Sequence, residues 1–137
     1  VKAHIFDPFE YLMLRHKAGK LNTDFKMPLG AVAWHAPCHQ RVQNMGSKTK
    51  DVLDLVPETT VTPIERCSGH DGTYGVRLET YDKSKKIARG TVSRIKRVEY
   101  DYFASDCPMA ATHLADELEL KHPETSPITL LRLAYGL

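Results

Sequence analysis

The stretch Ala31-Val32-Ala33-Trp34, which leads into Pro37-Cys38, decides the fold class. It is a short apolar run of β-formers after a glycine, and this pattern predicts a buried strand. Two later runs share these features and also follow a proline, glycine or charged break: Thr60-Val61-Thr62-Pro63-Ile64 and Tyr100-Asp101-Tyr102-Phe103-Ala104. Because proline cannot donate a hydrogen bond to a ladder, Pro63 indicates that the second run is an edge or bulged strand.

Segments with a helical period separate these three runs. Apolar residues recur mostly at steps of three and four over residues 42–56, and less regularly over residues 74–95. Prolines near helix starts and suitable capping residues predict further helices over residues 8–16, 108–120 and 127–134, the first of them with Asp7 as its N-cap. Strands that alternate with helices predict an α/β fold, with a small parallel sheet of βαβ units flanked by helices.

The three cysteines each follow one of the expected strands by a few residues. Cys38 follows Trp34, Cys67 follows Ile64, and Cys107 comes after the third run. The carboxyl ends of parallel strands share one edge of a sheet, so we expect the three thiols to meet in one crevice. Helix N-termini at such an edge favour thiolates, which are good metal ligands. The sequence therefore predicts a metal site at the C-terminal ends of the strands; the alternative is three buried, inert cysteines.

The segment Cys67-Ser68-Gly69-His70-Asp71-Gly72-Thr73-Tyr74-Gly75 concentrates three glycines at the second strand's end. Such a segment turns tightly and lets a bound group approach the backbone closely. Phosphate is an alternative occupant, but neither the P-loop pattern nor the dinucleotide-binding glycine pattern is present. An odd cysteine count in a chain without secretory features also makes disulfides the weakest interpretation.

This segment resembles the Cys-Cys-Gly-x-x-Gly-Thr-aromatic-Gly signature of the cysteine-rich (CCG-type) domains. These domains occur in iron-sulfur oxidoreductases related to heterodisulfide reductase. Examples are the B subunit of heterodisulfide reductase and the C subunit of anaerobic glycerol-3-phosphate dehydrogenase. His35-Ala36-Pro37-Cys38-His39 resembles the first motif of the family, and Asp106-Cys107-Pro108-Met109-Ala110 resembles the last. The resemblance implies that residues 1–137 form one such domain, with a core over residues 30–120, and are the C-terminal part of a longer protein.

Full family sites carry five thiols, which hold a noncubane iron-sulfur cluster. Here Ser68 and Ala110 stand where the family has the second cysteine of each pair, so the resemblance implies a variant site with three cysteines. A fourth ligand is then needed, and the histidines in or beside the motifs are the candidates, in the order His70, His39, His35 and His113. Three sulfurs and one nitrogen suit a [4Fe-4S] cluster or tetrahedral zinc, and the resemblance favours iron-sulfur.

Asp71 and Asp106 lie beside the motifs and either orient a ligand imidazole or serve as helix caps and turn residues.

The formal net charge is +2 and the basic residues are scattered, so nucleic acid is not an expected partner. No apolar stretch approaches the roughly 20 residues of a membrane span, and no signal peptide is recognisable, so we expect a cytoplasmic location.

The expected function is that of an iron-sulfur electron-transfer or oxidoreductase subunit, whose partner is a redox protein or another subunit. Two alternatives remain open. One is a structural or regulatory zinc domain of the same fold, and the other is a metal-free domain in which Cys67 or Cys107 acts as a redox thiol at a helix N-terminus.

Overall fold

A parallel sheet lies at the centre of the computed structural model, which describes residues 2–120 and 126–137. In the described residues its strands are β1 (Gly30–His35), β2 (Thr59–Ile64) and β3 (Tyr102–Ser105), in the order β2-β1-β3. The surrounding elements are a short 3-10 helix η1 (Lys2–His4) and the helices α1 (Pro8–Lys17), α2 (Cys38–Val42), α3 (Lys48–Leu53), α4 (Leu78–Ile95), α5 (Pro108–Glu117) and α6 (Pro127–Ala134). The predicted α/β fold is confirmed.

The register brings the carboxyl ends of the three strands to one edge. His35, the last residue of β1, pairs with Ile64 at the end of β2 and with Ser105 at the end of β3. Pro63 lies on β2, which is an edge strand as predicted, so its missing N–H costs no central ladder bond. The loops that carry the cysteines therefore leave the sheet side by side.

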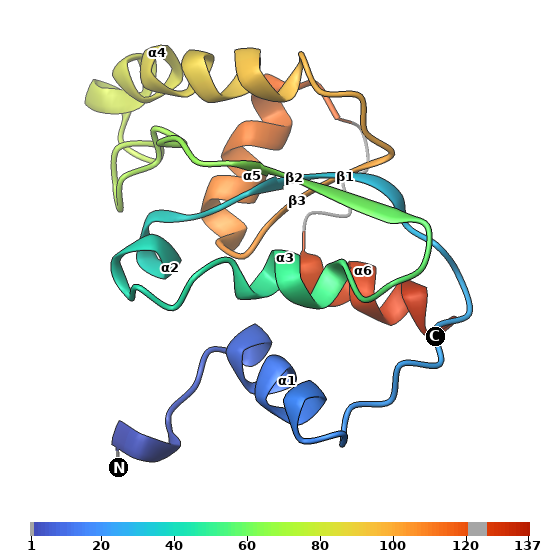
Figure 1. Ribbon diagram of the computed structural model, residues 1–137. Helices are drawn as coiled ribbons and strands as arrows, with labels where there is room; N and C mark the ends of the chain where they lie inside the picture. Colours follow the sequence, from blue (N-terminus) through green and yellow to red (C-terminus); the bar gives the residue numbers. More distant parts are fainter. Residues whose placement is uncertain (1, 121–125) are drawn as a thin grey trace.

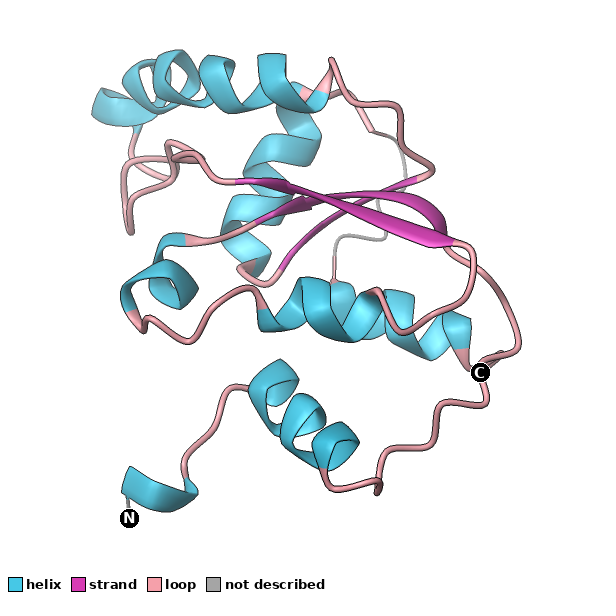
Figure 2. Cartoon of the chain, viewed as in Figure 1, coloured by secondary structure: helices cyan, strands magenta, loops and turns pink. Residues whose placement is uncertain are grey.

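Helices cover both faces of the sheet (Figures 1 and 2), and the strand residues alternate between them. Val32 and Trp34 pack into an apolar cluster with residues of α1, α3 and α6, such as Phe9, Val52 and Leu130. On the other face, Ala33 joins a cluster built from α4 and α5. The cysteine-bearing loops lie at the end of this sandwich.

Two predicted helix boundaries are wrong. The helix expected over residues 42–56 is interrupted: α2 ends at Val42 and α3 begins at Lys48, because Asn44 and Gly46 adopt positive φ angles of 53° and 77°. A continuous right-handed helix excludes such angles. The helix expected from Tyr74 begins only at Leu78, since the preceding residues form turns such as the Gly75 N–H to His70 C=O bond.

The other three predicted helices are present, and the Asp7 side chain caps α1 by accepting a hydrogen bond from the Phe9 N–H at 2.9 Å. Among the described residues, none of the helices combines the length and the apolar character needed to cross a bilayer.

Candidate metal centre

All three cysteines line one cavity of about 170 Å³ at the carboxyl edge of the sheet. Cys38 is the first residue of α2, Cys107 is the N-cap of α5, and Cys67 lies in the loop after β2. The same cavity is lined by Ser68 and Ala110, the two positions where the resemblance placed further thiols. The convergence expected from the strand ends is thus present, although α4 begins well beyond Cys67 because the glycine-rich loop intervenes.

The thiols are reduced and accessible. The side chains of Cys38 and Cys67 are exposed, that of Cys107 is partly buried, and none of the three forms a disulfide. The Gly69 N–H donates to Cys67 Sγ at 3.4 Å, and Cys107 stands at the positive end of the ten-residue helix α5. Both features place partial positive charge beside a sulfur. As these side chains stand, no three His, Cys, Asp or Glu residues in the described part of the chain are grouped so as to hold a metal ion.

His70 lines the cavity with an unpartnered nitrogen. The residue is 8% exposed and lines the cavity. Its Nε2 is buried and has no hydrogen-bond partner among the described residues. The preceding Gly69, at φ 81°, holds the loop against α4, where any Cβ would lie 2.3 Å from the Ser84 carbonyl oxygen. A buried imidazole nitrogen without a partner is costly, and a metal ligand would relieve that cost.

His35 also lines the cavity, but both of its ring nitrogens are engaged. Nε2 lies 2.8 Å from the Arg66 carbonyl oxygen, which can only accept, so Nε2 carries the proton and donates it. Nδ1 therefore accepts from the Ser105 hydroxyl at 3.0 Å. Burial lowers the pKa of His35, which keeps the ring neutral. His35 is thus a neutral cross-link between strand ends and has no free nitrogen for a metal.

This cross-link reaches the backbone beside two cysteines. Arg66 immediately precedes Cys67, and the Ser105 hydroxyl also accepts from the Cys107 N–H at 3.5 Å. His35 itself is the last residue of β1, shortly before Cys38. We call the set of His35, Ser105 and the Arg66 carbonyl the strand-end clamp. It holds the three cysteine loops in one arrangement.

The two remaining candidate histidines differ in position. His39 lines the cavity and is exposed, so its ring is accessible. His113 lies on α5 and does not line the cavity. The Ser84 hydroxyl donates its proton to the Gly69 carbonyl at 2.7 Å, so at 3.0 Å it accepts from His113 Nε2. His113 therefore supports the glycine-rich loop from behind.

Asp106 does not orient an imidazole. Its carboxylate accepts from Trp34 Nε1 at 2.7 Å and from Thr49 Oγ1 at 3.0 Å, on the α3 side of the sheet. Burial raises the pKa of Asp106, and these two donors oppose the rise. The residue therefore fixes the start of the Cys107 loop against β1 and α3.

Sequence reasoning missed the hydroxyl side chains that support the site. Thr91 Oγ1 donates to the Cys67 carbonyl at 2.6 Å, and Ser84, Ser105 and Thr49 act as described above. All four are at most 2% exposed. Their signal in the sequence is weak: each is a small polar residue at a position that the apolar period of its element places inside.

A family model described as a cysteine-rich domain, CCG, matches residues 32–115. This span covers more than half of the chain and includes all three cysteine loops. The chain belongs to the CCG cysteine-rich domain family. The resemblance seen in the three motifs is thereby confirmed.

Curated relatives of this CCG domain include the C subunit of anaerobic glycerol-3-phosphate dehydrogenase from Escherichia coli strain K12 and that from strain O157:H7. Each is 28% identical over an alignment of 137 positions, which covers 98% of this chain and 33% of the relative. The chain thus spans about a third of the length of these relatives. No solved structure matches it.

Proposed function

We propose that this CCG domain binds an iron-sulfur cluster through Cys38, Cys67, Cys107 and His70 and serves as an electron-transfer part of an oxidoreductase. The observation that supports this most is the convergence of three thiols and one orphaned buried nitrogen on a single cavity. Family membership and the similarity to a subunit of a dehydrogenase are consistent with it. The partner would be another subunit or a redox protein.

The cavity fits a multi-atom group better than a single ion. Its volume of about 170 Å³ is roughly ten times the ~15 Å³ that one water requires. A zinc ion draws its four ligands to about 2.0–2.3 Å from one centre, whereas the ligands of a cluster bind different iron atoms. Sulfur donors with one imidazole nitrogen are compatible with a [4Fe-4S] cluster, whose bound form supplies one-electron transfer.

The residues of the chain itself would set the properties of such a centre. The α5 N-terminus and the Gly69 N–H place partial positive charge beside the sulfurs, and the strand-end clamp holds their loops. Two of the three cysteines are exposed, so one side of the cavity is open to a partner. The domain would contribute position and potential rather than bond-making groups.

Zinc is the second candidate occupant, because three thiolates and one imidazole also form a common tetrahedral zinc site. In that case the metal would hold the three loops together and the domain would be structural or regulatory. His70 would be its nitrogen ligand here too.

Metal analysis of anaerobically purified protein tests the proposal. We expect iron and acid-labile sulfide in comparable amounts, with visible absorbance that bleaches on reduction by dithionite. Stoichiometric zinc without labile sulfide would replace the iron-sulfur proposal with the zinc alternative. A protein that remains without metal after anaerobic reconstitution with iron and sulfide, and whose three thiols all react with a labelling reagent, would contradict both.

Replacing His70 with alanine tests the fourth ligand. We expect His70→Ala to lose iron to a chelator at least about tenfold faster than the wild type, since even the loss of groups behind a ligand costs 10–100-fold in affinity. The electron paramagnetic resonance spectrum of the reduced centre should change as well. His39→Ala and His4→Ala are the controls: His39 lines the same cavity, whereas His4 is exposed at the end of η1, outside the cavity. A spectrum altered by His39→Ala and not by His70→Ala would transfer the ligand role to His39.

A further inference from the structure

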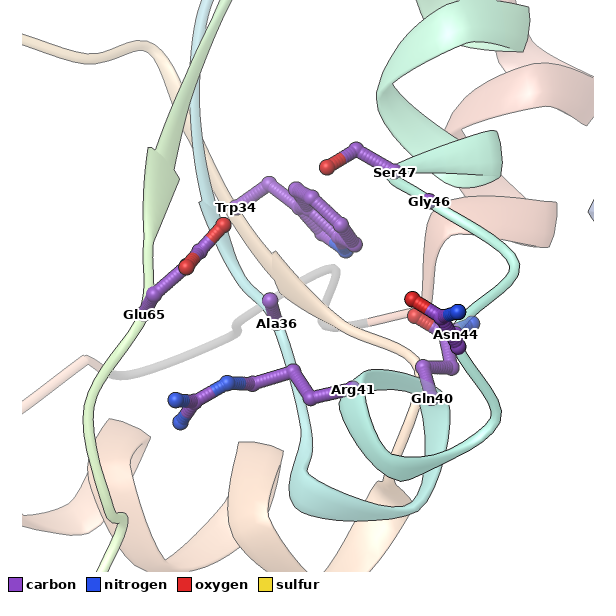
Figure 3. Close-up of a pocket in the computed structure, with 8 residues that line it drawn as sticks. All are labelled: Trp34, Ala36, Gln40, Arg41, Asn44, Gly46, Ser47 and Glu65. Carbon is purple, nitrogen blue, oxygen red and sulfur yellow. The ribbon is translucent and has the colours of Figure 1, made fainter.

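A second cavity, of about 220 Å³, lies on the other side of β1 from the cysteine cavity. Trp34 and Ala36 line it, whereas their neighbours His35 and Pro37 line the cysteine cavity. This alternation places the two cavities on opposite faces of the strand end. Figure 3 shows the second cavity, with polar side chains from α2, the following turn and the loop after β2 arranged around the Trp34 ring.

Hydrogen-bonding and charged groups dominate this second cavity. Arg41 and Glu65 supply one charge of each sign, and Gln40, Asn44 and Ser47 supply amides and a hydroxyl. Within the described residues neither Arg41 nor Glu65 forms an ion pair. In addition, Ser47 makes no capping hydrogen bond to α3, although it occupies the N-cap position. The two charged groups and the Ser47 hydroxyl are therefore free to bind a ligand, whereas the Gln40 amide nitrogen already donates to side chains of the protein at 3.4 Å.

The interruption between α2 and α3 makes room for the cavity. Asn44 and Gly46 take left-handed backbone angles there, and both line the cavity together with Ser47. The periodic sequence of residues 42–56 favours one continuous helix, which would have carried these residues elsewhere. The chain adopts a turn at this point instead, and that turn forms one wall of the cavity.

We propose that this second cavity binds a small carboxylate that also carries a hydroxyl or amino group. The Arg41 guanidinium matches a carboxylate through paired N–H donors. Glu65 and the Ser47 hydroxyl would accept from a hydroxyl or amino group, and the Asn44 amide can bind either end. The volume lies below the roughly 300 Å³ of the smallest drug-sized pockets, so the ligand is a small metabolite-sized molecule.

A ligand in this cavity would contact residues next to two of the cysteine loops directly, and the third loop through Trp34. Arg41 lies on α2, which begins with Cys38, and Glu65 lies two residues before Cys67. Trp34 donates to Asp106, the residue before Cys107. Binding is thus positioned to influence the metal centre, but the cavity itself does not depend on a bound metal.

The chain has one tryptophan, Trp34, which lines the cavity and serves as a built-in probe. We would titrate the protein as purified with L-malate and follow Trp34 fluorescence, with isothermal calorimetry as a second readout. Succinate lacks the hydroxyl, glycerol lacks the carboxylates, and inorganic phosphate tests for general anion binding. We expect saturable binding of malate that is tighter than that of succinate, and no saturable binding of glycerol.

Arg41→Gln is the deciding variant, and Arg94→Gln on α4 is the matched control, since both arginines are exposed. We expect Arg41→Gln to weaken malate binding at least about tenfold with an unchanged melting temperature, because charge-assisted bonds are lost. Arg94→Gln should bind malate like the wild type.

Three results would overturn the proposal. They are equal malate binding by Arg41→Gln and wild type, no saturable response at millimolar malate, and phosphate binding as tight as that of malate. Iron content is measured separately, so failure here leaves the cluster proposal standing.

Discussion

Replacing Cys107 with serine is expected to abolish binding of the proposed iron-sulfur cluster while leaving the domain folded. The variant would retain two thiols and His70 of the proposed ligand set, one ligand fewer than a [4Fe-4S] cluster needs. Cys107 is the N-cap of α5, and serine is among the best residues at that position, so helix stability should be maintained or improved. Iron, labile sulfide and visible absorbance should all fall to background, with circular dichroism unchanged.

Cys38→Ser is the parallel variant for this prediction. It changes a different loop of the same cavity, so a shared centre requires the same loss of iron. Full iron content in either variant would show that the thiols do not act together. Loss of iron in one variant alone would reduce the proposed site to two cysteines.

Replacing His35 with alanine is expected to lower the free energy of unfolding of the metal-free protein by about 3 kcal/mol. The side chain is 1% exposed, and its removal leaves the Ser105 hydroxyl and the Arg66 carbonyl without their partner. Urea denaturation near neutral pH measures the change. The folded fraction of His35→Ala should also retain iron poorly, because the strand-end clamp no longer aligns the cysteine loops.

His39→Ala is the control for the His35 prediction, since His39 is exposed and its loss should change stability by no more than about 0.5 kcal/mol.

The pH dependence of stability gives a second readout for His35. Because burial lowers the pKa of His35 below its ordinary 6.5, the unfolded chain binds a proton that the native side chain resists. Stability conferred by neutral His35 is present above pH 6.5 and is lost as the pH falls below it. His35→Ala should show a shallower loss, and an unchanged slope and stability would contradict the clamp.

The arrangement of strands could be predicted from the sequence because its signals are local. Each apolar run lies between clear breaks, and each is followed by a cysteine, so the common edge follows from parallel pairing alone. The interruption at residues 44–46 does not follow from the apolar period, which continues through it. Asn44 and Gly46 tolerate left-handed angles better than most residues, and that pair is the available signal.

The roles of the histidines could not be predicted in the same way. The sequence made both His35 and His70 candidates and ranked His70 first, but it could not show which of their ring nitrogens have tertiary partners. His35 meets the Arg66 carbonyl and Ser105, which are brought to it by strand pairing, whereas His70 Nε2 meets no described donor or acceptor. Which nitrogen stays free depends on contacts between residues far apart in the chain.

The wide spacing of the thiols also bears on how a centre of the proposed kind would be assembled. Each thiol belongs to a different strand-to-helix connection, and the three sulfurs share a cavity only after β1 has paired with both neighbours. In a zinc finger, by contrast, ligands a few residues apart let the metal organise the peptide. Closing two long loops around an inorganic group in an unfolded chain would carry a large entropic cost. A cluster of the proposed kind would therefore be inserted most easily into an apoprotein that has already folded.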